Sequence, residues 1–305
     1  MGERTSIQWS EATWNPVTGC TKVSPGCDNC YAERITNRLQ GPGAFDKVVL
    51  HPERLELPLH WKSPRMIFVN SMSDLFHRKV PEHYIYEVFR VMAHTPQHTF
   101  QVLTKRPDRM AMWFYLHKRI VCQDHFHHLP LPNVWLGTSI ENQRLAFSRL
   151  ETISHVPAVV RFASVEPLLG AIDLKRWLRG GNTVEGEPGG DILGFDAWLS
   201  WVIVGGESGR RARPMHPDWV RRIRDDCAQL RVPFFFKQWG EWRPATLHEV
   251  SQEGKRLMRF NDYNKSVYMR HVGKRAAGSL LDGREHREWP VGFGDAQVPQ
   301  QALRA

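Results

Sequence analysis

Short runs of β-branched and aromatic residues recur along this chain, and most are followed by a stretch whose apolar residues have helical spacing. The runs do not alternate between polar and apolar residues, as strands with one solvent-exposed face do. Strands of this kind, separated by helices, are typical of a parallel sheet that is buried on both faces. The sequence therefore predicts an α/β fold. The predicted strands are 66–70, 99–104, 134–138, 158–164, 201–204 and 233–237, and the clearest helices are 82–94, 142–151 and 217–230.

The β/α pattern divides the chain into a main part, residues 1–244, and a C-terminal part, residues 245–305. A further strand before the first cysteine, at 5–9 or 13–17, brings the main part to six or seven β/α units. Residues 180–199 open with a glycine-rich stretch, which indicates an exposed loop inserted between two units. In the C-terminal part, two alternating runs at 255–261 and 266–271 predict a hairpin, and 291–305 looks like a tail. We therefore expect a small β-containing extension.

Length and composition narrow the class of protein. The chain has 305 residues, of which 41% are hydrophobic and 24% charged, and this excludes a disordered, collagen-like or coiled-coil chain. No stretch approaches the roughly 18 apolar residues of a membrane span, and the first residues do not resemble a secretory leader. We therefore expect a cytoplasmic protein without a membrane partner. The formal net charge of +9 favours an anionic partner, with nucleic acid as the first candidate.

Polar side chains follow most of the predicted strands. In parallel sheets, open or closed, functional sites gather at the carboxyl ends of the strands. Asp74 follows a strand, but its position favours capping of the next helix. Glu207 follows two glycines, which let a ligand approach the backbone, and we expect Glu207 and Glu166 on the substrate side of a site. The strand-end residues suited to binding or catalysis are Ser71, Ser73, Lys105, Ser139, Glu166 and Glu207.

Three of the five cysteines, Cys20, Cys27 and Cys30, are close together with the spacing C-x6-C-x2-C. An odd number of cysteines argues against a complete disulfide framework. Soft sulfur ligands select iron–sulfur clusters or zinc. Because structural zinc needs a fourth ligand and none is nearby, the triplet favours an iron–sulfur cluster with one open iron, and zinc stays an alternative. The distant candidates for a fourth ligand are Cys122, Cys227, His125, His127 and His128.

The segment from Trp14 through Cys20 to Ala32 resembles the opening of the phage Gp37/Gp68-like proteins, a family of radical S-adenosylmethionine (SAM) type proteins. In outline the chain is also similar to the spore photoproduct lyase branch of radical SAM enzymes. The resemblance covers nearly the whole chain. It continues through residues 70–76, 103–106, 164–170, 204–209, 235–240, 273–278 and 281–284.

The resemblance implies a partial (β/α)6-type barrel in which the three cysteines hold a [4Fe-4S] cluster and SAM binds the fourth iron. An external electron donor would reduce the cluster, and cleavage of SAM would give a 5′-deoxyadenosyl radical that abstracts hydrogen from the substrate. The resemblance also suggests a partner protein encoded beside this one. Most such enzymes use C-x3-C-x2-C with an aromatic residue before the last cysteine, whereas here the first gap is longer and Tyr31 follows the last cysteine. In the spore photoproduct lyase branch a serine after the second strand and a lysine after the third serve SAM, and the matching positions here are Ser71 or Ser73, and Lys105. A solvated lysine at a helix start is the other interpretation of Lys105. Ser139 and Tyr31 are further candidates for cofactor binding.

A group of arginines follows Glu207, with Asp218 as the only acid among them. Guanidinium groups bind phosphate in a bidentate manner, so one interpretation is a patch that faces a nucleic acid, Arg210, Arg211 and Arg213 foremost. The other interpretation is a solvated helix face. The arginines are Arg210, Arg211, Arg213, Arg221, Arg222 and Arg224.

Two functions are compatible with these patterns. The first is a radical SAM enzyme that acts on an anionic substrate, DNA or a nucleotide, in repair or base modification. The second is a binding module in which zinc or a redox-inert cluster supports the fold and the basic face binds nucleic acid or protein. Metal content separates the two, because only the first requires iron and labile sulfide.

Overall fold

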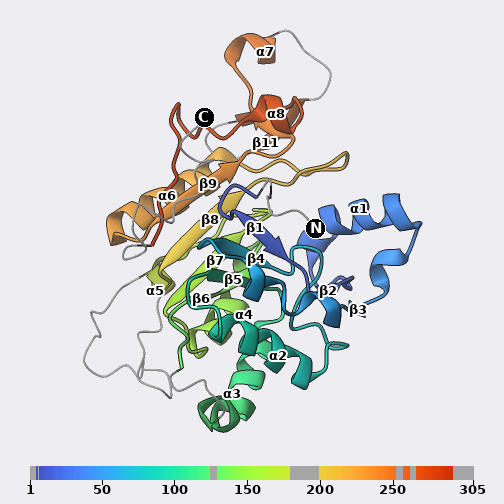
Figure 1. Ribbon diagram of the computed structural model, residues 1–305. Helices are drawn as coiled ribbons and strands as arrows, with labels where there is room; N and C mark the ends of the chain where they lie inside the picture. The colour runs from blue at the N-terminus through green and yellow to red at the C-terminus, as the bar shows by residue number, and fades with distance from the viewer. Residues whose placement is uncertain are drawn as a thin grey trace.

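A seven-stranded parallel sheet forms the centre of the protein (Figure 1). The computed structural model describes residues 5, 7–123, 129–178, 199–251, 257–261 and 266–290. After β1, each strand of the sheet lies beside the one that precedes it in the sequence. The strands are, in spatial order, β1 (Ala12–Trp14), β4 (Met66–Val69), β5 (Thr99–Thr104), β6 (Val134–Ser139), β7 (Val160–Val165), β8 (Trp201–Gly205) and β9 (Phe234–Gln238).

Helices cover one face of this sheet. Ile67 and Val69 of β4 belong to the same hydrophobic core as Ile85, Leu150 and other apolar helix residues. The sheet residues in between point to the opposite face, which explains why the strands read as continuous apolar runs. The helices that follow the strands are α2 (Glu82–Ala93), α3 (Pro107–Gln123), α4 (Gln143–Ser154), α5 (Lys175–Leu178) and α6 (Pro217–Leu230).

Aromatic side chains fill the opposite, inner face. Trp9 packs edge-on against Phe68, with ring centroids 4.7 Å apart, and Trp135 packs edge-on against Trp201 at 5.7 Å. The strand residues of this cluster come from the first three positions of their strands. The aromatic cluster therefore does not fill the space at the carboxyl ends of the strands, where a functional site can form. The buried members of the cluster are Trp9, Met66, Phe68, Trp135, Val160, Phe162, Trp201, Ile203 and Phe235.

The segment between β1 and β4 contains the cysteines. It includes α1 (Tyr31–Gln40), which begins directly after Cys30, and a small antiparallel pair of β2 (Val17–Thr18) and β3 (Val49–Leu50). Four short 3-10 helices complete it: η1 (Pro25–Cys27), η2 (Ala44–Asp46), η3 (Pro52–Arg54) and η4 (Leu57–His60).

The C-terminal part forms a second, antiparallel sheet in the order β10 (Trp242–Pro244), β12 (Ser266–His271), β11 (Leu257–Asn261), with α7 (Leu247–Ser251) and α8 (Lys274–Ala277). The predicted hairpin is β11 and β12. The chain then returns to the main sheet, where the amide of Phe236 donates to the carbonyl of His286 and the amide of Glu288 donates to the carbonyl of Phe234. This return covers the exposed edge of β9.

The predicted fold class, an α/β protein with a parallel sheet and a small C-terminal β extension, is confirmed. One alternative was wrong: the first strand is β1, which overlaps the prediction at 13–17, and no strand forms at 7–9 among the described residues. The division at residue 244 stays a prediction. The predicted insertion at 180–199, apart from Leu199, and the tail from 291 lie outside the described residues. Within the described part, no helix is long and apolar enough to cross a membrane.

Candidate functional site

A pocket lies at the carboxyl edge of the parallel sheet, and all three clustered cysteines line it. Two apolar side chains, Phe68 of β4 and Leu103 of β5, also line it. The strand-end rule thus brings together residues that are far apart in the sequence. The predicted site residues that line the pocket are Cys20, Cys27, Cys30, Tyr31, Ser71, Ser73, Lys105 and Ser139.

The backbone places each cysteine at a defined point of one loop. Gly19, just before Cys20, pairs with Ser73 and has a φ of +83°, and a side chain here would overlap the carbonyl of Lys47. Cys27 ends η1, and Cys30 is the N-cap of α1. All three thiols are free of disulfides. The loop therefore presents three thiols from one short segment.

Burial raises the pKa of Cys20 to about 11, and it also raises the pKa of Cys30. The carboxylate of Asp74 adds to the shift at Cys20, and the guanidinium of Arg106 opposes it. These thiols are therefore protonated at neutral pH in the absence of a cation. A bound metal would reverse the shift, because metal coordination deprotonates a thiol.

The donor set fits an iron–sulfur cluster. Three thiols that share one pocket are the soft ligands that such clusters take. In the part of the chain that the structure describes, no three His, Cys, Asp or Glu side chains are grouped so that they could hold a single metal ion. The thiols of a cubane cluster bind separate irons, so they need not converge on one point.

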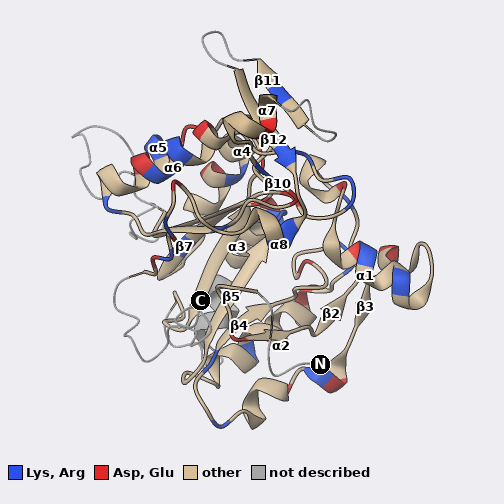
Figure 2. Ribbon diagram, turned by 90° about the horizontal axis from the view of Figure 1, so that it is seen from above, with Lys and Arg blue, Asp and Glu red and all other residues tan. Residues whose placement is uncertain are grey.

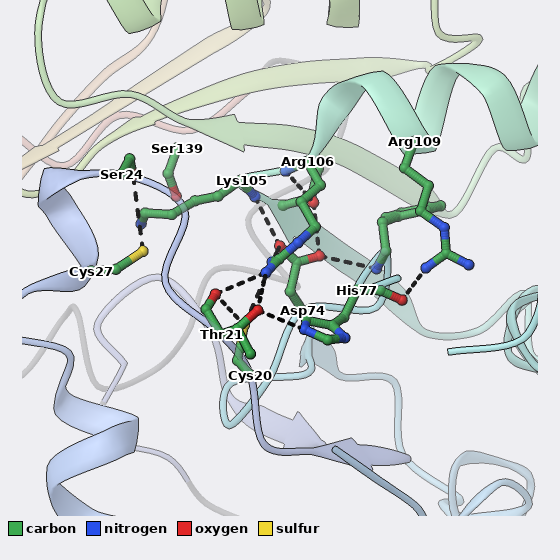
Figure 3. A network of polar contacts seen from close by, with 12 residues as sticks. Cys20, Thr21, Ser24, Cys27, Asp74, His77, Lys105, Arg106, Arg109 and Ser139 are labelled. Atoms are coloured by element: carbon green, nitrogen blue, oxygen red, sulfur yellow. Dashed lines mark hydrogen bonds and ion pairs between the residues drawn. The ribbon is translucent and has the colours of Figure 1, made fainter. Parts of the chain in front are cut away.

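The cysteine loop comprises residues 20–30, and a buried ion pair holds its first arm, Cys20 and Thr21 (Figure 3). Asp74 accepts a hydrogen bond from the hydroxyl of Thr104 at 2.8 Å and one from Nη1 of Arg106 at 2.8 Å. Arg106 in turn donates from Nη1 to Sγ of Cys20 at 3.5 Å and from Nη2 to the carbonyl of Thr21 at 2.8 Å. The interpretation of Asp74 as a helix cap was wrong, because α2 begins eight residues later and the carboxylate serves the loop instead.

A second carboxylate, Glu141, holds the middle of the loop. It is fully buried and accepts hydrogen bonds from the hydroxyl of Ser24 at 2.7 Å and from Arg149 at 3.3 Å. Lys105 lies 3.7 Å from the same carboxylate, and Figure 3 shows its side chain running toward Ser24. A side chain at Gly26 would overlap the carboxylate. The sequence analysis did not select Glu141, although a carboxylate two residues after the end of a buried strand was a signal.

A third contact holds the loop from the β8 side. Glu207 is nearly fully buried, and its carboxylate accepts from the amide of Arg213 at 2.8 Å and from Nη2 of Arg213 at 2.6 Å. Arg213 also donates to the carbonyl of Pro25 at 2.7 Å and lies 3.3 Å from the carboxylate of Asp28. Burial alone would raise the pKa of Glu207, but the hydrogen bonds from Arg213 outweigh it and lower this pKa. The carboxylate therefore stays ionised.

The hydroxyl groups at the pocket are partly engaged by the protein. Ser71 donates to Oδ1 of Asn15 at 3.2 Å, and Ser73 donates to the carbonyl of Val17 at 2.9 Å. Tyr31 donates its hydroxyl to the carbonyl of Ser71, while 44% of its surface stays exposed. Ser139 at the end of β6 is 4% exposed. Each serine oxygen keeps lone pairs that can accept a hydrogen bond from a ligand.

Glu166 lies outside the group of pocket-lining residues, at the end of β7. Its Oε1 is 2.9 Å from Nζ of Lys237, and its Oε2 accepts a hydrogen bond from Ser164 at 3.1 Å. The side chain is 15% exposed. Its position at a strand end agrees with the sequence analysis, and its role stays a prediction.

The arginines after Glu207 do not form one free cationic patch. Arg213 binds Glu207 as described, and Arg222 pairs with Asp173 at 2.8 Å. Arg221 and Arg224 both pair with Asp282, at 2.7 and 2.6 Å. Arg210 and Arg211 are exposed, and neither forms an ion pair with another residue that the structure describes. Figure 2 shows acidic residues interspersed with the basic ones along α6.

The remaining predicted ligands are not part of the pocket. Cys227 is fully buried in the hydrophobic core. The side chain of Cys122 and all of His125, His127 and His128 lie outside the described residues.

Comparison with known proteins gave one family. A family model described as "Protein of unknown function (DUF5131)" matches residues 4–290. No curated protein matched. Among solved structures, a cysteine-to-serine mutant of spore photoproduct lyase is 12% identical, has a TM-score of 0.40, and aligns over 86% of this chain and 69% of that chain. Spore photoproduct lyase complexed with dinucleoside spore photoproduct is also 12% identical, with a TM-score of 0.39, over 88% of this chain and 72% of that chain.

Proposed function

This chain belongs to the DUF5131 family, as its resemblance to the phage Gp37/Gp68-like proteins predicted, and we propose that it is a radical SAM enzyme. One observation carries the proposal: three free thiols of one loop line a pocket at the carboxyl edge of the parallel sheet, together with Lys105 and serine hydroxyls. Cys20, Cys27 and Cys30 would hold a [4Fe-4S] cluster. When reduced by an external donor, such a cluster would supply the electron for cleavage of SAM into methionine and a 5′-deoxyadenosyl radical, which would abstract hydrogen from the substrate.

The polar residues of the pocket suit the methionyl end of SAM, which carries a carboxylate and an ammonium group. Lys105 lines the pocket with its ammonium 3.7 Å from Glu141, and we assign this ammonium to the carboxylate of SAM. Ser71 and Ser73 donate to protein acceptors, which leaves their oxygen lone pairs available to accept from the ammonium of SAM. Ser139 offers a further hydroxyl, and the partly exposed ring of Tyr31 offers an apolar contact.

The two glutamates take different roles in this proposal. Glu207 is saturated by hydrogen bonds from Arg213, so we assign it to positioning of the cysteine loop. Glu166 keeps part of its carboxylate accessible beside Lys237 and remains our candidate on the substrate side. Arg210 and Arg211 keep their charges available for an anionic substrate, and Arg213 does not. The proposed substrate class is DNA or a nucleotide, for repair or base modification.

The test is metal content and SAM cleavage after anaerobic reconstitution. We expect about four irons and four sulfides per chain, as a [4Fe-4S] cluster requires, and release of 5′-deoxyadenosine after reduction with dithionite. Cys27→Ala should lose both the iron and the release. Cys227→Ala is the matched control, because this thiol is buried in the core, and it should retain both.

A wild-type protein that binds one zinc and neither iron nor sulfide would overturn the proposal in favour of a zinc-containing binding module. A protein that binds the cluster but releases no 5′-deoxyadenosine would contradict the enzyme assignment alone.

A further inference from the structure

Three basic side chains from distant parts of the sequence lie beside the cysteine pocket, on the side of β7 to β9. They are Arg34 on α1, Lys237 in β9 and Lys274 at the start of α8. The guanidinium of Arg34 lies against Gly209, where an added side chain would overlap it. Figure 2 shows basic residues on both α1 and α8.

One carboxylate joins two loops, one that contacts Arg34 and one that carries Lys274. Glu241 accepts a hydrogen bond from the amide of Gly209 at 2.9 Å and one from the amide of Lys274 at 3.2 Å. The loop that touches Arg34 and the loop that begins with Lys274 are therefore held together through Glu241. The backbone is held in this way, while the side chains of Arg34 and Lys274 are themselves exposed to solvent.

The nearby carboxylates leave positive charge uncompensated. Glu166 is 2.9 Å from Nζ of Lys237, and Glu241 is engaged by two backbone amides. Neither Arg34 nor Lys274 forms an ion pair with any residue of the described ranges. Burial lowers the pKa of Lys274, and the charges of Lys237 and Arg34 lower it further, although Glu166 and Glu241 act in the opposite direction.

The position of this group relates it to the cysteine pocket. Arg34 follows Tyr31 by three residues on α1, which places both side chains on the same face of the helix, and Tyr31 lines the pocket. Residues 272–276, which include Lys274, line a surface hollow of their own. Gly273 at its start has a φ of +89° and no side chain to obstruct a ligand.

We propose that Arg34, Lys237 and Lys274 bind a phosphate group of the substrate, which is a nucleic-acid strand or a free nucleotide. A phosphate offers several strong acceptors to guanidinium and ammonium donors, and its charge would balance the excess of cations. This inference rests on the proposed function and deepens it, because it assigns the substrate phosphate to a place next to Tyr31. The arginines that follow Glu207 are mostly paired and contribute less.

The test measures binding of a fluorescein-labelled single-stranded DNA decamer by anisotropy, with the reconstituted full-length protein at low salt. Arg34→Ala and Lys274→Ala should each weaken binding about tenfold, which corresponds to about 1.4 kcal/mol. Each should also lower the slope of log K against log salt by about 0.7, the value for one phosphate contact to a single strand. Arg222→Ala is the matched control, since it removes the same charge from a residue that is paired with Asp173, and it should bind as the wild type does.

Competition distinguishes the two sources of phosphate. If a mononucleotide 5′-phosphate displaces the labelled decamer as effectively as unlabelled decamer does, the ligand is a nucleotide. If only the unlabelled decamer displaces it, the ligand is a nucleic-acid strand. Both results support the phosphate site. It is overturned if the wild type does not bind, or if Arg222→Ala weakens binding as much as Arg34→Ala and Lys274→Ala do. Iron content is measured for every variant. If Arg34→Ala and Lys274→Ala retain both the iron content and the DNA affinity of the wild type, the phosphate site is refuted and the proposed cluster is not affected.

Discussion

Replacing Arg106 with alanine tests whether a buried ion pair holds the cysteine loop. The side chain of Arg106 is 12% exposed and that of Asp74 is 8% exposed. Arg106 also reaches Sγ of Cys20 and the carbonyl of Thr21. Its removal takes four donated hydrogen bonds from the site and leaves the carboxylate of Asp74 without its cation.

The expected cost can be bounded from these contacts. Breaking a buried ion pair by removal of one partner costs about 3–5 kcal/mol, because the other charge stays buried. Asp74 keeps hydrogen bonds from the hydroxyl of Thr104 and the amides of Phe76 and Lys105, which compensate part of the loss. We therefore expect Arg106→Ala to lower the free energy of unfolding by about 3 kcal/mol, the lower end of that range. Iron binding should fall as well, because the first arm of the loop loses its support.

The assay is urea unfolding of the apo protein, followed by circular dichroism, with iron content after reconstitution as a second measurement. Arg221→Ala is the control. Arg221 makes as many hydrogen bonds, to Asp218 and Asp282, but its side chain is 38% exposed. Exposed ion pairs contribute about 0–1 kcal/mol, so this variant should be close to the wild type in stability and iron content. Equal destabilisation by the two substitutions would refute the reasoning that burial, and not the number of bonds, sets the cost.

Two further predictions concern a glycine and a carboxylate. Gly19→Ala should abolish iron binding, because the added methyl group would meet backbone atoms. Gly41 has a φ of +97° and no neighbour within 4 Å of an added side chain. Gly41→Ala should therefore retain iron and lose only about 1–3 kcal/mol of stability, measured by urea unfolding. The pKa of Glu249 is about 2, below its ordinary 4.5. Hydrogen bonds from Arg243 are the main cause, and the charge of Arg270 makes a smaller contribution. This depressed pKa stabilises the folded state above about pH 4.5 and the effect is lost as the pH falls toward 2. Glu249→Gln should therefore be less stable than the wild type by about 1 kcal/mol at pH 6, and the difference should vanish near pH 2 in urea unfolding curves; a difference independent of pH would contradict this.

The parallel sheet was predictable because each strand is buried on both faces and therefore appears as an apolar run. The strand at 99–104 was predicted with the observed bounds, and α6 was predicted at 217–230 as observed. The strand predicted at 158–164 begins at Val160 instead, two residues later. The three cysteines and the strand-end serines were found because spacing and position along the chain are local properties.

The ionic contacts that hold the cysteine loop were not predictable in the same way. Glu141 contacts Ser24, which precedes it by 117 residues, and Arg213 contacts Pro25 across 188 residues. A pairing across such distances depends on how the strands are ordered in space, and no local pattern encodes it. The same limit applies to the arginines after Glu207, where sequence showed the excess of cations but not that Asp282 would pair with two of them.

The three loop contacts share one geometric cause. The carboxylates of Asp74, Glu141 and Glu207 follow β4, β6 and β8, which are alternate strands of the same sheet. Alternate strands reach the carboxyl edge at separate points around the curved sheet, so the loop is held at its first arm, its middle and its β8 side. A loop held at three separate points has little freedom to rotate or shift, and the entropy of ordering three thiols is lost on folding and not on metal binding. The sheet that builds the pocket therefore also preorganises the cysteines that line it.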